Sequence, residues 1–286
     1  MKPTRPKPAK KKEKEVFKDH SCLSSLDFNH QLSFFYKEGS VEKAKEIIES
    51  QHILSSVFAK NNVEWWMRKR THAKKDDPKF LPFAKQVVPS LPEYDQLFGK
   101  VSQDCVRNNK PKMLMSLYPT PEKGIRLLPN LLKETLFTFT QGAENKKEIL
   151  SFLCQQSIIQ NSHVDNSEKP AIFQGTLVVL RANPSLIPAP ALEVLLGMVS
   201  VRQALHILLR DKKDHIPQNL HPFTQSLSQV YLCHLNKGQQ EEAFHYIKTQ
   251  PEFEKLLEYI PHLLNHHIKE EVGKEEHYSP TKKRKI

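Results

Sequence analysis

Two adjacent tryptophans lie in the most basic internal segment of this 286-residue chain. Residues 60–79 hold seven Lys and Arg side chains against three acidic ones. Indole rings can stack on nucleic-acid bases while Arg and Lys neutralise phosphates, so the segment is a candidate nucleic-acid contact. Its candidate contact residues are Trp65, Trp66, Arg68, Lys69, Arg70, Lys74 and Lys75. In a continuous helix, a spacing of four would place Trp66, Arg70 and Lys74 on one face.

The same residues allow a simpler interpretation. Both tryptophans could anchor a helix to the core while the basic side chains solvate its outer face. The two interpretations are compatible with each other, because one ring can be buried while the other stays exposed.

A second basic cluster closes the sequence. Lys282, Lys283, Arg284 and Lys285 follow Ser279-Pro280. The arrangement resembles a monopartite nuclear import signal, which implies an import receptor as a partner and the nucleus or the nucleolus as the location. Lys10 to Lys14 form a second candidate, and the sequence leaves open which cluster dominates import.

The positive charge is unevenly distributed along the chain. Residues 1–18, 60–79 and 282–285 carry +6, +4 and +4, which leaves −3 for the remainder of a formal net charge of +11. The body between the tails is therefore slightly acidic. We expect it to bind proteins rather than to wrap nucleic acid.

No catalytic motif is evident. The four cysteines are far apart with no CxxC pair, and no ordered set of nucleophile, base and orienting group can be recognised. His262 and His266 have the spacing of helical metal ligands but no evident partner ligand, so we interpret them as surface or structural histidines. We expect no enzyme activity, no cofactor and no metal.

The rest of the chain predicts an all-α protein, either an irregular helical bundle or a short α-solenoid with disordered basic tails. The low glycine count of 8 disfavours turn-rich sheet folds, and no apolar run is long enough to predict a membrane span. Prolines predict a poor helix and a linker at 77–92. The predicted organisation is a basic tail at 1–18, a helical region at 19–76, the linker at 77–92, a helical domain at 93–271, and a tail at 272–286.

One predicted helix pair resembles the middle of a tetratricopeptide repeat. Phe35 and Tyr36 precede the turn glycine Gly39, Ala44 follows five residues later, and Ile48 comes four after that. Leu235, Gly238, Ala243 and Ile247 repeat these offsets, and Val199, Ala204 and Leu208 repeat them without the glycine. The resemblance implies stacked helical hairpins, in which a small alanine allows close helix approach.

Such hairpins, together with basic tails and a Trp-containing basic segment, are similar to the family of helical subunits A of the selectivity factor for RNA polymerase I. The similarity implies a role in nucleolar transcription or ribosome biogenesis. We therefore expect a nuclear scaffold or adaptor that binds other proteins of a multi-subunit complex. The alternative is a direct DNA- or RNA-binding protein that uses residues 60–79.

Overall fold

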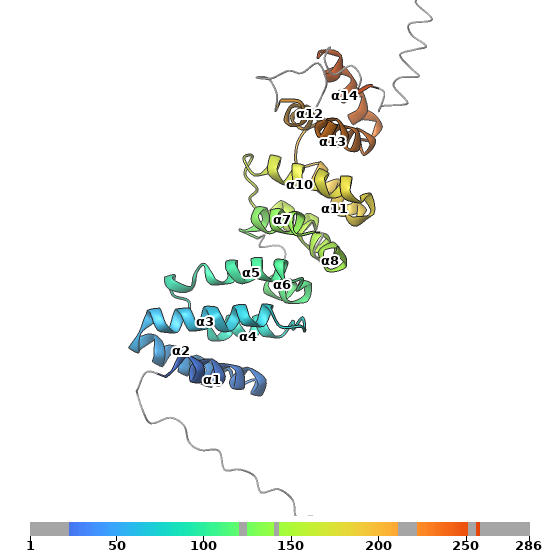
Figure 1. Ribbon diagram of the computed structural model, residues 1–286. Helices are drawn as coiled ribbons and strands as arrows, with labels where there is room; N and C mark the ends of the chain where they lie inside the picture. Colours follow the sequence, from blue (N-terminus) through green and yellow to red (C-terminus); the bar gives the residue numbers. More distant parts are fainter. Residues whose placement is uncertain (1–22, 120–124, 140–142, 211–221, 251–255, 258–286) are drawn as a thin grey trace, which may run out of the picture. The chain divides into compact units, whose positions relative to one another are not determined.

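The fold is all-α, as the sequence predicts. A computed structural model describes residues 23–119, 125–139, 143–210, 222–250 and 256–257. These residues form fourteen α-helices and no strand (Figure 1). They make two compact units, which we call unit 1 and unit 2. Unit 1 is the described part of 1–70 with 83–95, and unit 2 is the described part of 71–82 and 96–286.

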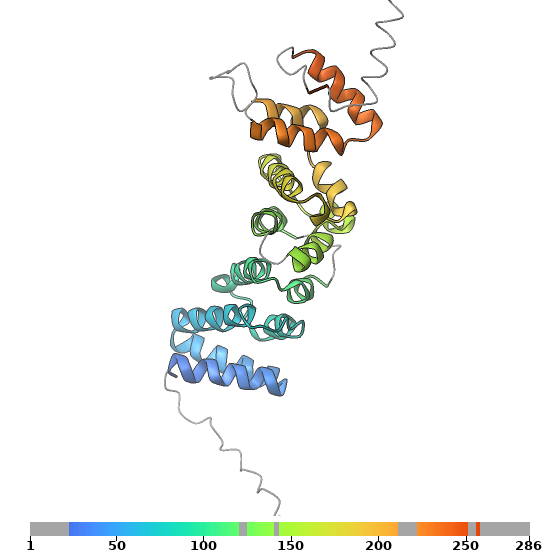
Figure 2. The same cartoon turned by 45° about the vertical axis from the view of Figure 1, so that its right-hand side comes forward.

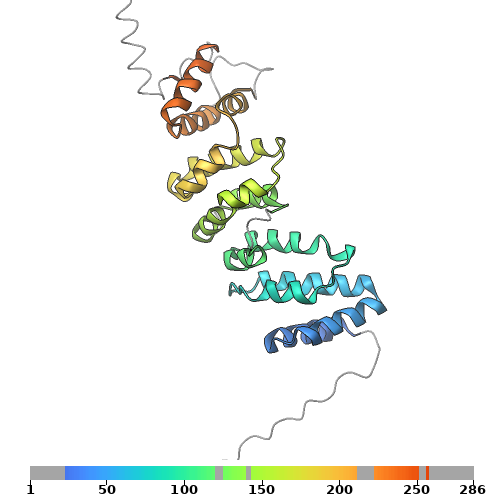
Figure 3. The same ribbon diagram turned by 180° about the vertical axis from the view of Figure 1, so that it is seen from behind.

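Unit 1 is built on a helical hairpin. Its elements are α1 (Ser25–Glu38), α2 (Val41–Leu54), nearly all of α3 (Ser56–Thr71), the second half of α4 (Phe80–Val87), and the 3-10 turn η1 (Pro92–Tyr94). α1 and α2 lie side by side, and Figure 3 shows them from behind. The aromatic rings of Phe28 and Phe58 meet edge to face at 5.9 Å, which packs α1 against α3.

Local signals fix where α1 begins and ends. The Ser24 hydroxyl accepts a hydrogen bond from the backbone N–H of Asp27 at 3.2 Å, which caps the first turn. At the other end Gly39 adopts a left-handed conformation with φ 70°, which an L side chain adopts only at a cost. The turn predicted at Gly39 is therefore confirmed. Ala44 and Ile48 beyond it are fully buried.

The range predicted as a proline-rich linker contains a helix. α4 spans Phe80–Val87, and Phe80, Ala84 and Val87 are fully buried in it. Pro82 is the third residue of this helix, where the backbone N–H has no partner within the helix, so a proline loses no hydrogen bond there. The prediction of a poor helix at 77–92 is wrong for this reason.

Unit 2 stacks further helices in two rows. α5, α7 and α10 are neighbours in that order, and α6 and α8 form the second row with α11 beside α8 (Figures 1 and 3). α10 also packs against α13, and α12 packs against α13 and α14, as Figure 2 shows. The helices are α5 (Leu97–Arg107), α6 (Pro111–Leu117), α7 (Leu128–Phe137), α8 (Ala143–Leu153), α9 (Gln156–Asn161), α10 (Lys169–Ala182), α11 (Ala189–Leu196), α12 (Val201–Arg210), α13 (Pro222–Cys233) and α14 (Lys237–Lys248), with the 3-10 turn η3 (Pro184–Leu186).

The second tetratricopeptide-like match differs from the first in its turn. Leu235, Ala243 and Ile247 are buried in the α13–α14 hairpin, as the offsets predict. Gly238, however, lies in the first turn of α14 rather than between the helices. The start of α14 is instead set by a capping box in which Asn236 and Gln239 exchange side-chain to backbone hydrogen bonds. A glycine is not needed where the cap residue has an extended backbone.

Candidate functional site

The basic segment 60–79 is divided between a helix and a turn. α3 ends at Thr71, and residues 72–79 lead from it to α4. Lys74 therefore does not continue the helical face of Trp66 and Arg70, as it would in an unbroken helix. The candidate contact residues fall into two groups. One ends at Arg70 and belongs to unit 1, whereas the other, Lys74 and Lys75, belongs to unit 2.

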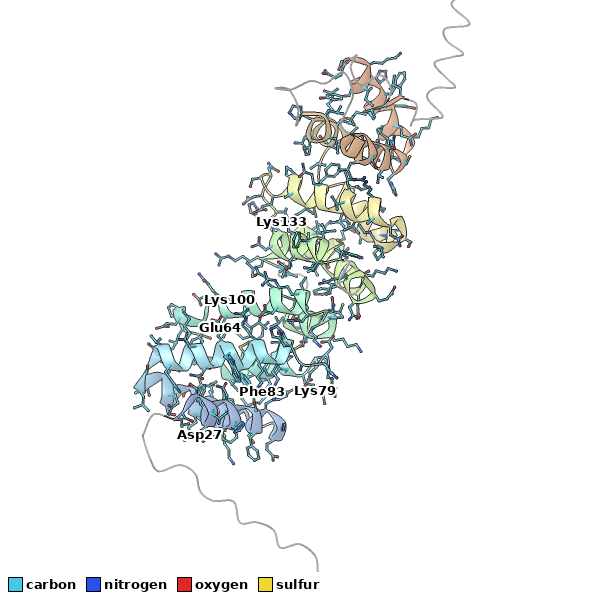
Figure 4. All side chains as sticks on the ribbon, viewed as in Figure 1. Asp27, Glu64, Lys79, Phe83, Lys100 and Lys133 are labelled. Atoms are coloured by element: carbon cyan, nitrogen blue, oxygen red, sulfur yellow. The ribbon has the colours of Figure 1, made fainter. Side chains whose placement is uncertain are left out.

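Trp66 is a core residue of unit 1. Its side chain is only 2% exposed, and its ring lies 6.5 Å from that of Phe83 in an edge-to-face contact. Phe83, labelled in Figure 4, also meets the ring of Tyr36 at 5.2 Å. This aromatic cluster ties α3 to α4 and α1. A ring buried in this way cannot stack on a base, so the core interpretation holds for Trp66.

Trp65, in contrast, is 49% exposed. The ammonium group of Lys69 lies 4.4 Å from the centroid of its ring, within cation–π distance. The other basic side chains of α3 also have contacts in unit 1. Arg68 is 3.6 Å from the carboxylate of Glu64, and the guanidinium of Arg70 is 5.1 Å from the ring centroid of Tyr36. Trp65 is therefore the tryptophan of the pair that offers ring surface to solvent.

The turn after α3 is held in place by two carboxylates. The carboxylate of Asp76 accepts hydrogen bonds from the backbone N–H groups of Lys112 and Met113, at 2.8 and 2.9 Å. It thereby caps the first turn of α6 from outside. Asp77 accepts from the N–H of Lys79 at 3.2 Å and so caps the start of α4. Both negative charges lie at the positive ends of helix dipoles, where they are stabilising.

A buried lysine holds the same turn from the other side. Lys110 is 6% exposed, and its ammonium group donates to the backbone carbonyls of Ala73 and Lys74, the second at 3.1 Å. The side-chain amide of Asn108 donates to the hydroxyl of Thr71 at 3.2 Å. The turn is thus fixed in two ways: its backbone carbonyls accept hydrogen bonds from Lys110, and its carboxylates accept hydrogen bonds from backbone N–H groups.

Only some of these contacts have a local signal in the sequence. Two aspartates before Pro78 and an apolar run are a local signal for a helix cap, and Asp77 fits it. Sequence reasoning missed the role of Asp76, because the N–H groups that it caps come 36 and 37 residues later. It also missed Lys110, since a buried lysine has no local signal.

Lys146 in α8 repeats the arrangement one hairpin later. Its side chain is fully buried, and its ammonium group donates to the backbone carbonyl of Val106, in the last turn of α5. Burial lowers the pKa of Lys146 from 10.5 to about 8, with an opposing contribution from Glu134. Next to it, the amide of Asn145 donates to the carbonyl of Asn109 at 3.2 Å. In both hairpins a buried lysine and a nearby asparagine thus donate hydrogen bonds to an earlier part of the chain.

Exposed apolar side chains gather in unit 1. Of the eight large apolar side chains that are exposed among the described residues, six lie between residues 26 and 65. They are Leu26 and Phe34 in α1, Ile53 and Leu54 at the end of α2, and Val57 and Trp65 in α3. Leu26, His30 and Phe34 are all exposed at a spacing of four, and we call them the α1 stripe.

Several sequence predictions fall outside the described residues. They are the import cluster Lys282 to Lys285, the tails 1–18 and 272–286, and the histidine pair His262 and His266.

Within the residues that the structure does describe, no group of three or more His, Cys, Asp or Glu side chains could hold a metal ion. Burial raises the pKa of the Cys154 thiol to about 12 and also raises that of Cys105. Neither thiol is a nucleophile at neutral pH.

Comparison of the chain with protein-family models, with curated proteins and with solved structures gave no match. Across the described ranges, no single helix has the length and apolar character to cross a membrane. The helix pair Ala189–Leu196 and Val201–Leu209 passes that test only when the two are taken together, and it is bent by 78°.

Proposed function

We propose that this protein is a nuclear helical scaffold or adaptor, which binds other proteins of a transcription or ribosome-biogenesis complex. The observation that carries the proposal is the α1 stripe. Leu26 and Phe34 are 66% and 54% exposed on the first described helix of the chain. Arrays of helical hairpins ordinarily end in a polar outer face. An apolar stripe at such a position is typical of a helix face that packs against a partner.

The arrangement of hairpins supports a finer proposal, that the body is a short tetratricopeptide-like α-solenoid. α5 with α6, and α7 with α8, are consecutive hairpins whose first helices are neighbours. Lys110 directly precedes α6 and Lys146 lies within the first turns of α8, and each donates a hydrogen bond to a backbone carbonyl from an earlier part of the chain. Repeated contacts between successive hairpins are what a stacked array requires.

Partner capture tests the adaptor role. Tagged full-length protein would be incubated with nuclear extract, and bound proteins would be quantified by mass spectrometry. We compare the wild type with the double variant Leu26→Asp and Phe34→Asp. The matched control replaces Lys37 and Lys43, two exposed residues of the same hairpin, with Ala, which lowers the net charge by the same amount. The proposal expects a set of partners that the stripe variant loses and the control keeps, with equal thermal melting of all three proteins.

An unchanged partner set in the stripe variant would refute the role of α1.

The nuclear location has a separate test. A fluorescent fusion that lacks residues 281–286 should lose much of its nuclear signal if Lys282 to Lys285 are the main import signal. An equally nuclear fusion would show that they are not.

A further inference from the structure

The turn between α3 and α4 presents basic side chains on a fixed backbone. Lys74, Lys75 and Lys79 are exposed, and so is Lys112, whose own N–H binds the carboxylate of Asp76. None of the four ammonium groups makes a hydrogen bond or an ion pair within the described residues. We call these four residues the turn lysines; Figure 4 labels Lys79.

The acidic residues of this turn are already engaged with backbone groups. Asp76 accepts from two N–H groups of α6, and Asp77 accepts from the N–H of Lys79. Their charge is directed at helix ends rather than paired with the turn lysines. Lys110, whose ammonium group lies beneath the turn, adds a further positive charge and binds two carbonyls. The exposed surface of the turn is therefore basic. Because its backbone is already held by hydrogen bonds, binding does not incur the entropy cost of ordering it.

We infer that the turn lysines form a binding site for the phosphate backbone of duplex DNA. The complementary charge is the first argument, since duplex DNA carries about one negative charge per ~1.7 Å. The chemistry of the side chains is the second. The turn has no Phe, Tyr or Trp on which a single strand could stack, and lysines contact phosphates without reading bases. The hydroxyl of Thr71 and the amide of Asn108, which lie at the start of the turn, are bonded to each other rather than presented to a 2′-hydroxyl of RNA.

This assignment differs from the candidate set 60–79 taken as a whole. It leaves out Trp66, which is buried, and the arginines of α3, which contact Glu64 and Tyr36. It keeps Lys79 and adds Lys112, which lies outside that segment in the sequence. It also does not rest on the proposed protein-binding role, because the α1 stripe has no residue in common with it.

Binding of a fluorescent duplex of about 24 base pairs tests the inference, with anisotropy measured from about 50 to 200 mM salt. The turn variant carries Ala at all four turn lysines. The control carries Ala at four other solvent-accessible lysines, namely Lys37, Lys43, Lys45 and Lys237. Both proteins have the same net charge and keep both tails, so the tail contribution is common to them. A third protein with Arg at the four turn positions tests whether charge is the property that matters.

The turn variant should lose at least about tenfold in affinity near 100 mM salt, and the slope of log K against log salt should fall by about 3 to 4. The control should stay within about twofold, and the Arg variant should bind like the wild type. Equal loss in the turn variant and the control would overturn the site. A larger loss for a single strand or for duplex RNA would overturn the assignment to duplex DNA, and so would equal competition by poly-glutamate at matched charge. Partner capture by the turn variant should be unchanged, which separates this test from that of the adaptor role.

Discussion

Replacement of Lys146 by methionine should change how stability depends on pH. The ammonium group of Lys146 is fully buried, and its pKa falls from 10.5 to about 8 on folding. This shift corresponds to about 3 kcal/mol of differential stabilisation between the charged and neutral forms. Because the folded pKa is the lower one, the unfolded chain binds more protons between about pH 8 and 10.5. Stability from this residue therefore rises with pH across that window.

Urea unfolding of the wild type and Lys146→Met at pH 7 and about pH 9.5 measures the effect. At the higher pH the folded lysine is almost entirely neutral while the unfolded one is still mostly charged. The free energy of unfolding of the wild type should gain about 2 kcal/mol relative to the variant between the two values. Other groups that titrate in this range are present in both proteins, so their contributions cancel when the unfolding free energy of the variant is subtracted from that of the wild type.

Lys147→Met is the matched control, since the side chain of Lys147 is 31% exposed and paired with Glu144 at 3.2 Å. Its difference from the wild type measures what the same substitution costs at an accessible position of the same helix, and it is compared with that of Lys146→Met at each pH. A difference for Lys146→Met that does not vary with pH would refute the buried, perturbed ammonium group. So would a difference that moves in the opposite direction.

Three further substitutions test the packing and the caps, each by chemical denaturation. Trp66→Ala should cost about 3 to 5 kcal/mol because it empties a core site, whereas Trp65→Ala should cost less than about 1, and equal costs would contradict the assigned burial. Asp76→Ala should cost about 1 to 3 kcal/mol because two N–H groups of α6 lose their acceptor, and a loss below about 0.5 would show that the cap is not needed. Gly39→Ala should cost about 1 to 2 kcal/mol because alanine has to adopt a positive φ, and a neutral result would mean that the turn can relax.

The helices were predictable because their signals are local. Gly39 marks the end of α1, and the low glycine count disfavours sheets, in agreement with the absence of strands among the described residues. α4 was missed because Pro82 was taken as a helix breaker, although its place in the first turn makes it harmless. The decisive information was the exact start of the helix, which a sequence pattern locates poorly.

The candidate site was predicted only in part. The pair Trp65 and Trp66 allows both a stacking surface and a core anchor, and the structure buries Trp66 in the core and leaves Trp65 half exposed. The division at Thr71 was not predicted, because helical residues and turn residues carry the same basic side chains on either side of it. Asp76 and Lys110 were missed because their partners are distant in sequence, so only the packed structure brings them together.

The buried amine of Lys146 has a consequence for chemical labelling. Acylating reagents attack neutral amines, and burial lowers the pKa of Lys146 only while the side chain is enclosed, so an exposed Lys146 has the pKa of an ordinary lysine. The same side chain has no accessible surface in the folded protein. Its reaction with such a reagent therefore waits for α8 to separate from α5. The rate of acylation at Lys146 therefore measures how often the two helices separate. The rate at exposed lysines measures only the intrinsic reactivity of the reagent.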